Sequence, residues 1–198
     1  MALCVLTGDI VGSTELPRAS QERVLSLIET AFQRLSQHAS DKLDFYRGDG
    51  WQMRFQDAGS GLQYALFIRA VLKSEDDAFD TRVAIADTAG SAPVPKAWDA
   101  NAEASGRALD DMPRDVLMAH AAGGAQHAAT LLADHISRHW TAAQARAIGP
   151  FLAPRPRVTQ QQIADTLGIT RQAVGQALDA AGYGPISRAL KALKAQAQ

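Results

Sequence analysis

Residues 3–14 read LCVLTGDIVGST, and the first structural unit of the chain is predicted from them. The part from Leu3 to Asp9 is short and mostly apolar, which is typical of a buried strand. Gly12 follows and permits a tight turn out of that strand. Residues 17–39 then carry apolar side chains at helical spacing, which predicts a helix. The sequence therefore begins with a predicted strand–turn–helix unit that has an aspartate at the strand end.

Predicted strands and helices continue to alternate beyond this unit. Gly48-Asp49-Gly50 lies between two strand-like segments, and Asp-Gly is a strong signal for a hairpin. The resulting order, strand–helix–strand–strand–helix–strand, is typical of a ferredoxin-like α/β sandwich. We expect strands at 3–9, 43–47, 51–55, 81–86 and 116–119, and helices at 17–39, 62–73, 100–111 and 130–148.

Composition limits the class of protein. The chain has 198 residues, of which 46% are hydrophobic and 21% are charged, so a disordered chain, a collagen-like fibre and a coiled coil are excluded. No run approaches the roughly 18 apolar residues of a membrane span, and no basic segment precedes Leu3 as in a secretory signal. Cys4 is the only cysteine, which excludes a disulfide framework and a cysteine-rich zinc site. We expect a cytoplasmic protein with no membrane partner.

A proline-rich segment and a change of charge predict two modules. Residues 149–156 contain three prolines, which remove backbone donors and disfavour helix before them. Residues 1–154 carry 14 Lys and Arg against 19 Asp and Glu, whereas residues 155–198 carry 6 against 2. The basic module is suited to nucleic acid, and chance variation of charge in a short segment is the alternative. The expected boundaries are 1–125 for a nucleotide-sensing domain, 126–154 for a helical connector and linker, and 155–198 for a DNA-binding domain.

Two aspartates end neighbouring strands of the predicted sheet. Asp9 closes the first strand and Asp49 lies at the hairpin tip, so the topology brings both carboxylates to one edge. Mg²⁺ and Mn²⁺ take oxygen ligands, usually one or two carboxylates together with phosphates. The glycine-containing turn after the first strand is suited to hold those phosphates, which predicts a metal–nucleotide site. The alternative is that Asp9 caps a helix and Asp49 only shapes a turn. The expected nucleotide contacts here are Gly12, Ser13, Thr14 and Gly48.

Three segments resemble class III nucleotidyl cyclases. The sequence LTGDIVGST at 6–14 looks like their first metal motif, and RGDG at 47–50 with the strand after it resembles their second. The segment DANAEASGRAL at 99–109 is similar to the helix that carries their transition-state asparagine and arginine. SatD-like proteins, which this chain resembles in overall organisation, join such a domain to a C-terminal DNA-binding segment. The resemblance implies a homodimer, because the cyclase site lies between two protomers.

The same resemblance shows where this sequence departs from the cyclases. Arg107 falls where their transition-state arginine stands, but Glu103 occupies the position of the asparagine, and its carboxylate repels a polyphosphate. Phe45 falls where a lysine reads adenine in adenylate cyclases, and a phenyl ring donates no hydrogen bond. The metal pair is kept, whereas base selection and transition-state support are altered. We therefore expect nucleotide binding, with Arg107 as a contact, and no fast turnover.

Residues 158–178 predict a helix-turn-helix. Thr159 and Gln162 form a capping box for the first helix, Gly168 suits the turn, and Thr170 caps the second helix. Polar residues remain outward at the start of the second helix, of types that pair with base edges in the major groove. The alternative is an ordinary pair of helices packed on the first domain. The residues expected to contact DNA are Arg157, Gln160, Thr170, Arg171, Gln172, Gln176 and Arg188.

Taken together, these patterns predict a DNA-binding transcriptional regulator. Its cyclase-like domain would bind a nucleotide or a nucleotide-derived messenger with Mg²⁺ or Mn²⁺. The ligand would alter the spacing of two recognition helices in a homodimer on double-stranded DNA. Two alternatives stay open. One is a divergent but active cyclase with a DNA-binding tail, and the other is constitutive DNA binding with the first domain used only for dimerisation.

Overall fold

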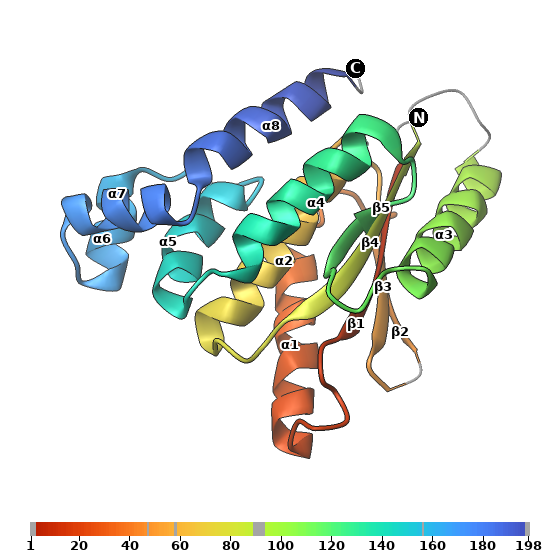
Figure 1. Cartoon of the computed structure of the whole chain (residues 1–198), viewed down its shortest axis with the longest axis horizontal. Helices are drawn as coiled ribbons and strands as arrows, with labels where there is room; N and C mark the ends of the chain where they lie inside the picture. Colours follow the sequence, from red (N-terminus) through yellow and green to blue (C-terminus); the bar gives the residue numbers. More distant parts are fainter. Residues whose placement is uncertain (1–2, 47, 58, 89–93, 156, 197–198) are drawn as a thin grey trace.

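The protein folds as a mixed α/β structure (Figure 1). The computed structural model describes residues 3–46, 48–57, 59–88, 94–155 and 157–196, and within them eight helices accompany one five-stranded sheet. The strands are β1 Leu3–Ile10, β2 Lys42–Tyr46, β3 Gly50–Phe55, β4 Thr81–Thr88 and β5 Met118–His120. The helices are α1 Arg18–Leu35, α2 Gly61–Glu75, α3 Val94–Asp110, α4 Gly124–Arg138, α5 Ala142–Leu152, α6 Gln160–Leu167, α7 Arg171–Ala180 and α8 Tyr183–Gln196. None of the described helices is long and apolar enough to cross a membrane.

The sheet has the strand order β2-β3-β1-β4-β5. β1 runs antiparallel to both β3 and β4, and β5 joins parallel to β4. β2 and β3 form the predicted hairpin, and β1 and β3 are central neighbours, with Asp9 opposite Gly50 in the register. The predicted order of the first six elements is confirmed, and the end of β1 lies beside the tip of the hairpin.

Helices cover both faces of the sheet. Figure 1 shows α1, α2 and α4 on one face and α3 on the other, with α5 to α8 forming a further layer outside α2 and α4. One hydrophobic cluster runs from β1 through α2 to buried residues of the C-terminal helices, such as Val174 and Ile186. A smaller cluster under α3 contains Leu109 and Met112. The C-terminal helices are therefore packed onto the sheet through α5 and α2.

Trp51 explains a glycine in β1. The indole lies opposite Gly8, and a side chain at position 8 would collide with it and with the main-chain oxygen of Arg82. The indole N–H donates to the Thr81 hydroxyl at 3.0 Å, and that hydroxyl donates to the main-chain oxygen of Asp9 at 2.6 Å. Because Gly8 has no Cβ, the Trp51 indole can lie against β1. Its hydrogen bond to the Thr81 hydroxyl then helps to anchor the end of the strand, which carries Asp9.

The single helix expected at 130–148 is wrong. The structure has two helices there, α4 and α5, because Thr141 starts a new helix with a capping box. The Thr141 hydroxyl accepts from the Gln144 N–H at 3.3 Å, and the Gln144 side chain accepts from the Thr141 N–H at 3.0 Å. Trp140, just before the cap, turns inward and donates to the main-chain oxygen of Ala181 at 2.8 Å. Apolar residues recur at helical spacing throughout residues 130–148, so the spacing alone does not indicate where one helix ends and the next begins.

Other boundaries also differ from the sequence prediction. Gly149 and Pro150 form the last part of α5, so the proline-rich segment begins as helix, and the non-helical connection to α6 is shorter than predicted. Pro150 lies two residues before the end of α5, so few helical residues follow the hydrogen bond that its missing N–H removes. α1 ends at Leu35 instead of residue 39, because Ser36 has an extended backbone. α3 begins at residue 94 instead of 100.

A buried ion cluster ties α2 to the start of β4 and to α4. The Arg69 side chain is fully buried and donates to both carboxylate oxygens of Asp80 at 2.7 and 2.8 Å. It also donates to Asp134 at 2.9 Å, and Lys73 lies 3.2 Å from Asp80. Burial by itself would raise the pKa of Asp80, but the charges of Arg69 and Lys73 outweigh it and hold that pKa below its usual value.

Replacing Arg69 with Met leaves the buried carboxylates of Asp80 and Asp134 with one cation each among the described residues, Lys73 at 3.2 Å and Arg138 at 2.6 Å. We expect the free energy of unfolding to fall by about 3–5 kcal/mol. The lowered pKa of Asp80 also predicts that its contribution is present above about pH 4 and is lost as the pH falls through the folded-state value. Denaturant unfolding across pH measures both effects. The control Arg23→Met breaks an exposed pair with Glu75 and should cost less than about 1 kcal/mol. Equal losses in the two variants would contradict the prediction.

Candidate functional site

The first candidate site is a pocket of about 340 Å³ where β1 ends. Asp9 and Asp49 line it from the sheet edge, and Gly106 and Asp110 line it from α3. The hairpin tip is held against β1 because the Ile10 N–H donates to the main-chain oxygen of Asp49 at 3.3 Å. The structure thus brings together the two carboxylates that the sequence singles out.

Asp9 is partly buried beside the Arg82 guanidinium. One carboxylate oxygen of Asp9 lies 3.5 Å from the Arg82 guanidinium, and the other is buried with no hydrogen-bond partner among the described residues. Burial raises the pKa of Asp9, the charge of Asp49 raises it further, and Arg82 partly opposes both. Arg82 is held in place by the main-chain oxygen of Met112, to which it donates at 2.8 Å. The site therefore contains one buried carboxylate oxygen that is still able to take a ligand.

The turn after β1 orients the second carboxylate. Gly12 has a φ of +63°, which glycine adopts without strain, and its carbonyl accepts from the N–H groups of Glu15 and Leu16 at 2.9 and 3.2 Å. The Ser13 hydroxyl donates to Asp49 at 2.5 Å. Of the expected phosphate contacts, Ser13 is thus in direct contact with the carboxylate pair. Thr14 and Gly48 are exposed nearby in their turns.

The donor set fits a hard divalent cation with external ligands. Asp9 and Asp49 supply carboxylate oxygens to one pocket. One oxygen of Asp9 accepts no hydrogen bond from the described residues, which is expected of an oxygen that binds a metal ion. Across the described part of the chain, no group of three or more His, Cys, Asp or Glu side chains is arranged to hold a metal ion. The remaining ligands would have to be water and the phosphates of a bound nucleotide, which is how Mg²⁺ is commonly held.

α3 presents different residues to the sheet and to solvent. Its inward face carries Ser105, whose hydroxyl is 2.7 Å from that of Thr7, and Asn101, which donates to the main-chain oxygen of Leu3 at 3.3 Å. Glu103 and Arg107 point outward and pair with each other at 2.7 Å, with both side chains 67% exposed. Arg107 consequently does not line the Asp9–Asp49 pocket of its own protomer. Phe45 is exposed on the edge strand β2.

Two residues of this site were missed by sequence reasoning. Arg82 is a lone charge inside the apolar strand predicted at 81–86, and this pattern is a signal that a carboxylate lies nearby. Asp110 carries no such signal, because its place in the pocket depends on how α3 packs across the sheet.

The second candidate site is the helix-turn-helix formed by α6 and α7. The Thr159 hydroxyl accepts from the Gln162 N–H at 3.3 Å, and the Gln162 side chain accepts from the Thr159 N–H at 2.9 Å, so the predicted capping box is confirmed. Gly168 ends α6 with a φ of +66°. The Thr170 hydroxyl then caps α7 by accepting from the Ala173 N–H at 3.1 Å. Local sequence signals thus determine both helices and the turn.

The two faces of this unit also match the sequence pattern. Ile163, Ala164, Val174 and Leu178 are buried, and α5 packs against α7 as a third helix of the unit. The first turns of α7 present an exposed polar face. The predicted DNA contacts that are exposed are Arg157, Thr170, Arg171, Gln172, Gln176 and Arg188, whereas Gln160 is half-buried at the start of α6.

No protein-family model and no curated protein sequence matches this chain. The resemblance to class III nucleotidyl cyclases and SatD-like proteins therefore rests on the motif residues themselves. What those residues do has to be argued from their contacts, their burial and their charges.

Replacing Asp9 with Asn should raise the melting temperature at pH 7, because the amide removes a charge that burial and Asp49 disfavour. We expect a rise below about 4 °C, which corresponds to about 1 kcal/mol in a chain of this size. The pKa of Asp9 is raised in the fold, so the carboxylate takes up a proton and its unfavourable charge is lost as the pH falls through that value. The difference in melting temperature between the wild type and Asp9→Asn should disappear there. Scanning calorimetry at several pH values measures this.

Mn²⁺ provides a second readout of the same variant. It should raise the melting temperature of the wild type and of the control Asp44→Asn, which changes an exposed aspartate on β2, but not of Asp9→Asn. Equal stabilisation of all three proteins by Mn²⁺ would place the metal elsewhere.

Proposed function

We propose that the protein is a sequence-specific DNA-binding regulator. The observation that carries the proposal is a left-handed Gly168 turn between two capped helices, followed by exposed Arg171, Gln172 and Gln176 at the start of α7. Arginine and glutamine are the side chains that make bidentate contacts with guanine and adenine in the major groove. In helix-turn-helix proteins these contacts come from the N-terminal part of the second helix.

Charge supports the same assignment. Residues 155–198 carry 6 Lys and Arg against 2 Asp and Glu, whereas the rest of the chain is acidic. Arg157 precedes α6 and Arg188 lies on α8, both exposed, and we assign them, with Gln160, to phosphate contacts that position the unit on the duplex. Because phosphate contacts release counterions, DNA affinity should fall with salt.

We further propose that the sheet domain binds a nucleotide or a nucleotide-derived messenger together with Mg²⁺ or Mn²⁺. The support is the pocket that Asp9 and Asp49 share, the unpartnered oxygen of Asp9, and the turn at Gly12 beside it. We assign the first four strands to a ferredoxin-like, cyclase-like sandwich. The antiparallel order β2-β3-β1-β4, with α1 and α2 as connections, supports this assignment.

Slow turnover and a homodimer complete the proposal. Arg107 pairs with Glu103 on the exposed side of α3, so its charge is partly cancelled and lies outside the pocket of its own protomer. In a cyclase-like dimer the site lies between protomers, and Arg107 would then reach the partner's pocket. A ligand there would change the spacing of two copies of α7, which must match half-sites about one DNA turn apart. An active cyclase with a DNA-binding tail is the second candidate, favoured by the carboxylate pair alone.

Arg171→Ala tests the recognition helix. On an operator selected from random duplexes, we expect the variant to lose about 1–3 kcal/mol of binding free energy and to relax specificity at one position. Fluorescence anisotropy at several salt concentrations measures affinity and salt dependence. Arg114→Ala, which removes an exposed arginine outside the helix-turn-helix, should change neither. If wild type binds selected and random duplexes equally, the regulator assignment fails.

A panel of nucleoside triphosphates and cyclic nucleotides with Mn²⁺ tests the sheet domain. We expect one of them to bind, to change operator affinity by at least about fivefold, as in typical allosteric coupling, and to remain chemically intact. Asp49→Ala should abolish the effect, and the matched Asp44→Ala should not. A cyclic product detected by mass spectrometry in the wild type and absent from Asp49→Ala would favour the enzyme. Unchanged operator affinity with every ligand would leave constitutive DNA binding.

A further inference from the structure

A second cavity lies between α2 and the C-terminal helices. It has a volume of about 950 Å³, and its walls are the start of α2, the end of α5, the segment before α6, and α8. A recess of about 200 Å³ adjoins it and shares Gln63, Tyr183 and Lys191 as lining residues. Its residues Asp57 and Ser60 follow β3, whose end pairs with Cys4, whereas Asp9 is five residues further along β1, roughly 17 Å away. The cavity is thus separate from the Asp9–Asp49 pocket.

The lining of this cavity is strongly positive. Four cations line it, Arg155 and Arg157 before α6 and Lys191 and Lys194 on α8, against the single carboxylate of Asp57. Lys194 lies 3.8 Å from Asp57. For the other three cations no hydrogen bond or ion pair is formed with any residue that the structure describes. A cavity with several uncompensated cations concentrates anions.

The start of α2 adds to this field. Ser60 is the N-cap residue, but its side chain makes no cap; its hydroxyl instead accepts from the Lys194 ammonium at 3.0 Å. The first N–H groups of a helix carry partial positive charge and are suited to bind anions. Ser60 and Gln63 line the cavity, so this helix end and the four cations act on the same space.

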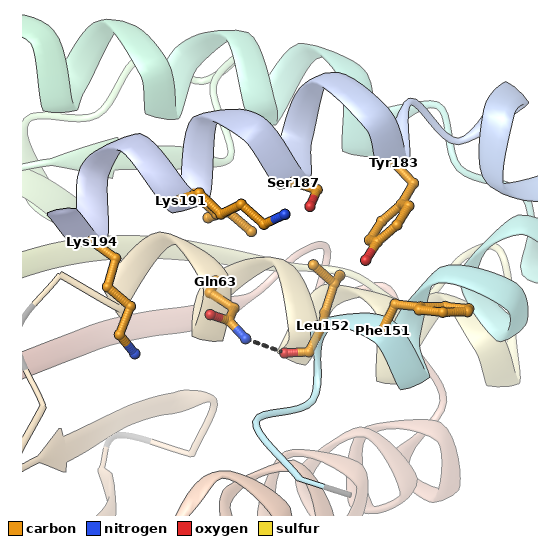
Figure 2. Close-up of a pocket in the computed structure, with 8 residues that line it drawn as sticks. Gln63, Phe151, Leu152, Tyr183, Ser187, Lys191 and Lys194 are labelled. Carbon is orange, nitrogen blue, oxygen red and sulfur yellow. Dashed lines mark hydrogen bonds between the residues drawn. The ribbon is translucent and has the colours of Figure 1, made fainter. Parts of the chain in front are cut away.

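The adjoining recess has both apolar and polar lining residues. Phe151 of α5 and Tyr183 of α8 pack with ring centroids 5.2 Å apart, and Leu152 lies beside them. Figure 2 shows Tyr183 and Lys191 on α8 facing Leu152 and Gln63 across the recess, with Gln63 donating to the main-chain oxygen of Leu152 at 2.8 Å. Flat apolar groups stack on such rings, while the cations lie within reach of an attached anion.

We propose that this cavity binds a small organic polyanion that carries a flat ring, with phosphate or carboxylate groups at the cations and the ring near Phe151. A DNA backbone is the less favoured occupant, because no described residue of α6 or α7 lines the cavity. In this proposal Arg157 contacts the bound anion, in place of the DNA phosphate contact assigned to it above. Arg155 and Arg157 belong to the connection that leads into α6, so a bound ligand would tie that connection to α2 and α8. A role of the cavity as an effector site for the helix-turn-helix rests on the proposed DNA binding, whereas anion binding in the cavity does not, and neither requires a ligand at Asp9.

Calorimetric titration of the full chain in EDTA tests the proposal, with ATP and inorganic pyrophosphate as probes. Without metal, the carboxylates of Asp9 and Asp49 repel both probes, so the binding measured belongs to the basic cavity. We expect both to bind, ATP more tightly because of its ring. Lys191→Gln should weaken both by about tenfold, the effect of one lost charged contact. The matched Arg114→Gln removes an exposed cation outside the cavity and should leave both affinities unchanged.

Asp57→Asn is the decisive second variant, because it removes the one carboxylate among the described lining residues while an amide oxygen still accepts from Tyr64. It should strengthen pyrophosphate binding by about threefold, a change that loss of structure cannot produce. The proposal is overturned if neither probe binds at millimolar concentration, or if Lys191→Gln and Arg114→Gln behave alike. It is also overturned if Lys191→Gln weakens random duplex DNA and not the small anions, which would assign the cavity to nucleic acid.

Discussion

The fully buried guanidinium of Arg69 fixes how α2, the start of β4 and α4 are placed against one another. An isolated charge at that depth is strongly unfavourable, so Asp80 and Asp134 must stay in place around it. Asp80 opens β4, and its main-chain oxygen accepts from the Val11 N–H at 3.1 Å. Asp134 lies on α4 and accepts from the Leu117 N–H before β5 at 3.1 Å. One side chain of α2 thus aligns two strands, one helix and the turn beside Asp9.

Different parts of α2 contact the surroundings of the Asp9–Asp49 pocket and of the basic cavity. One side holds the ion cluster that fixes the start of β4, and another packs against α5. Its N-cap residue Ser60 and the nearby Gln63 line the basic cavity. The same helix is therefore in contact with the start of β4, beside the Asp9–Asp49 pocket, and with the basic cavity.

Features set by neighbouring residues were predictable from the sequence, and features set by distant packing were not. The hairpin at Asp49, the Gly168 turn and the cap at Thr159 follow from residues a few positions apart, and all three are present. The meeting of Asp9 with Asp49 was also predictable, because strand order determines it. The partners of Arg69 lie 11 and 65 residues away, and no local pattern points to them. The basic cavity was missed for the same reason, since its walls come from four separated segments.

The helix α5 belongs to both halves of the molecule. It packs against α2 on the sheet side and against α7 on the side of the helix-turn-helix. The proline-rich segment suggests a boundary for truncation, but a cut at residue 155 would separate α5 from α7. The C-terminal piece would lose the third helix of its core, and the N-terminal piece would expose the apolar flank of α5 that α7 covers. Dissection of this protein is therefore better done by point substitution than by truncation. An exchange of the helices after residue 155 for those of another protein would have to include α5 and the surface of α2 that packs on it.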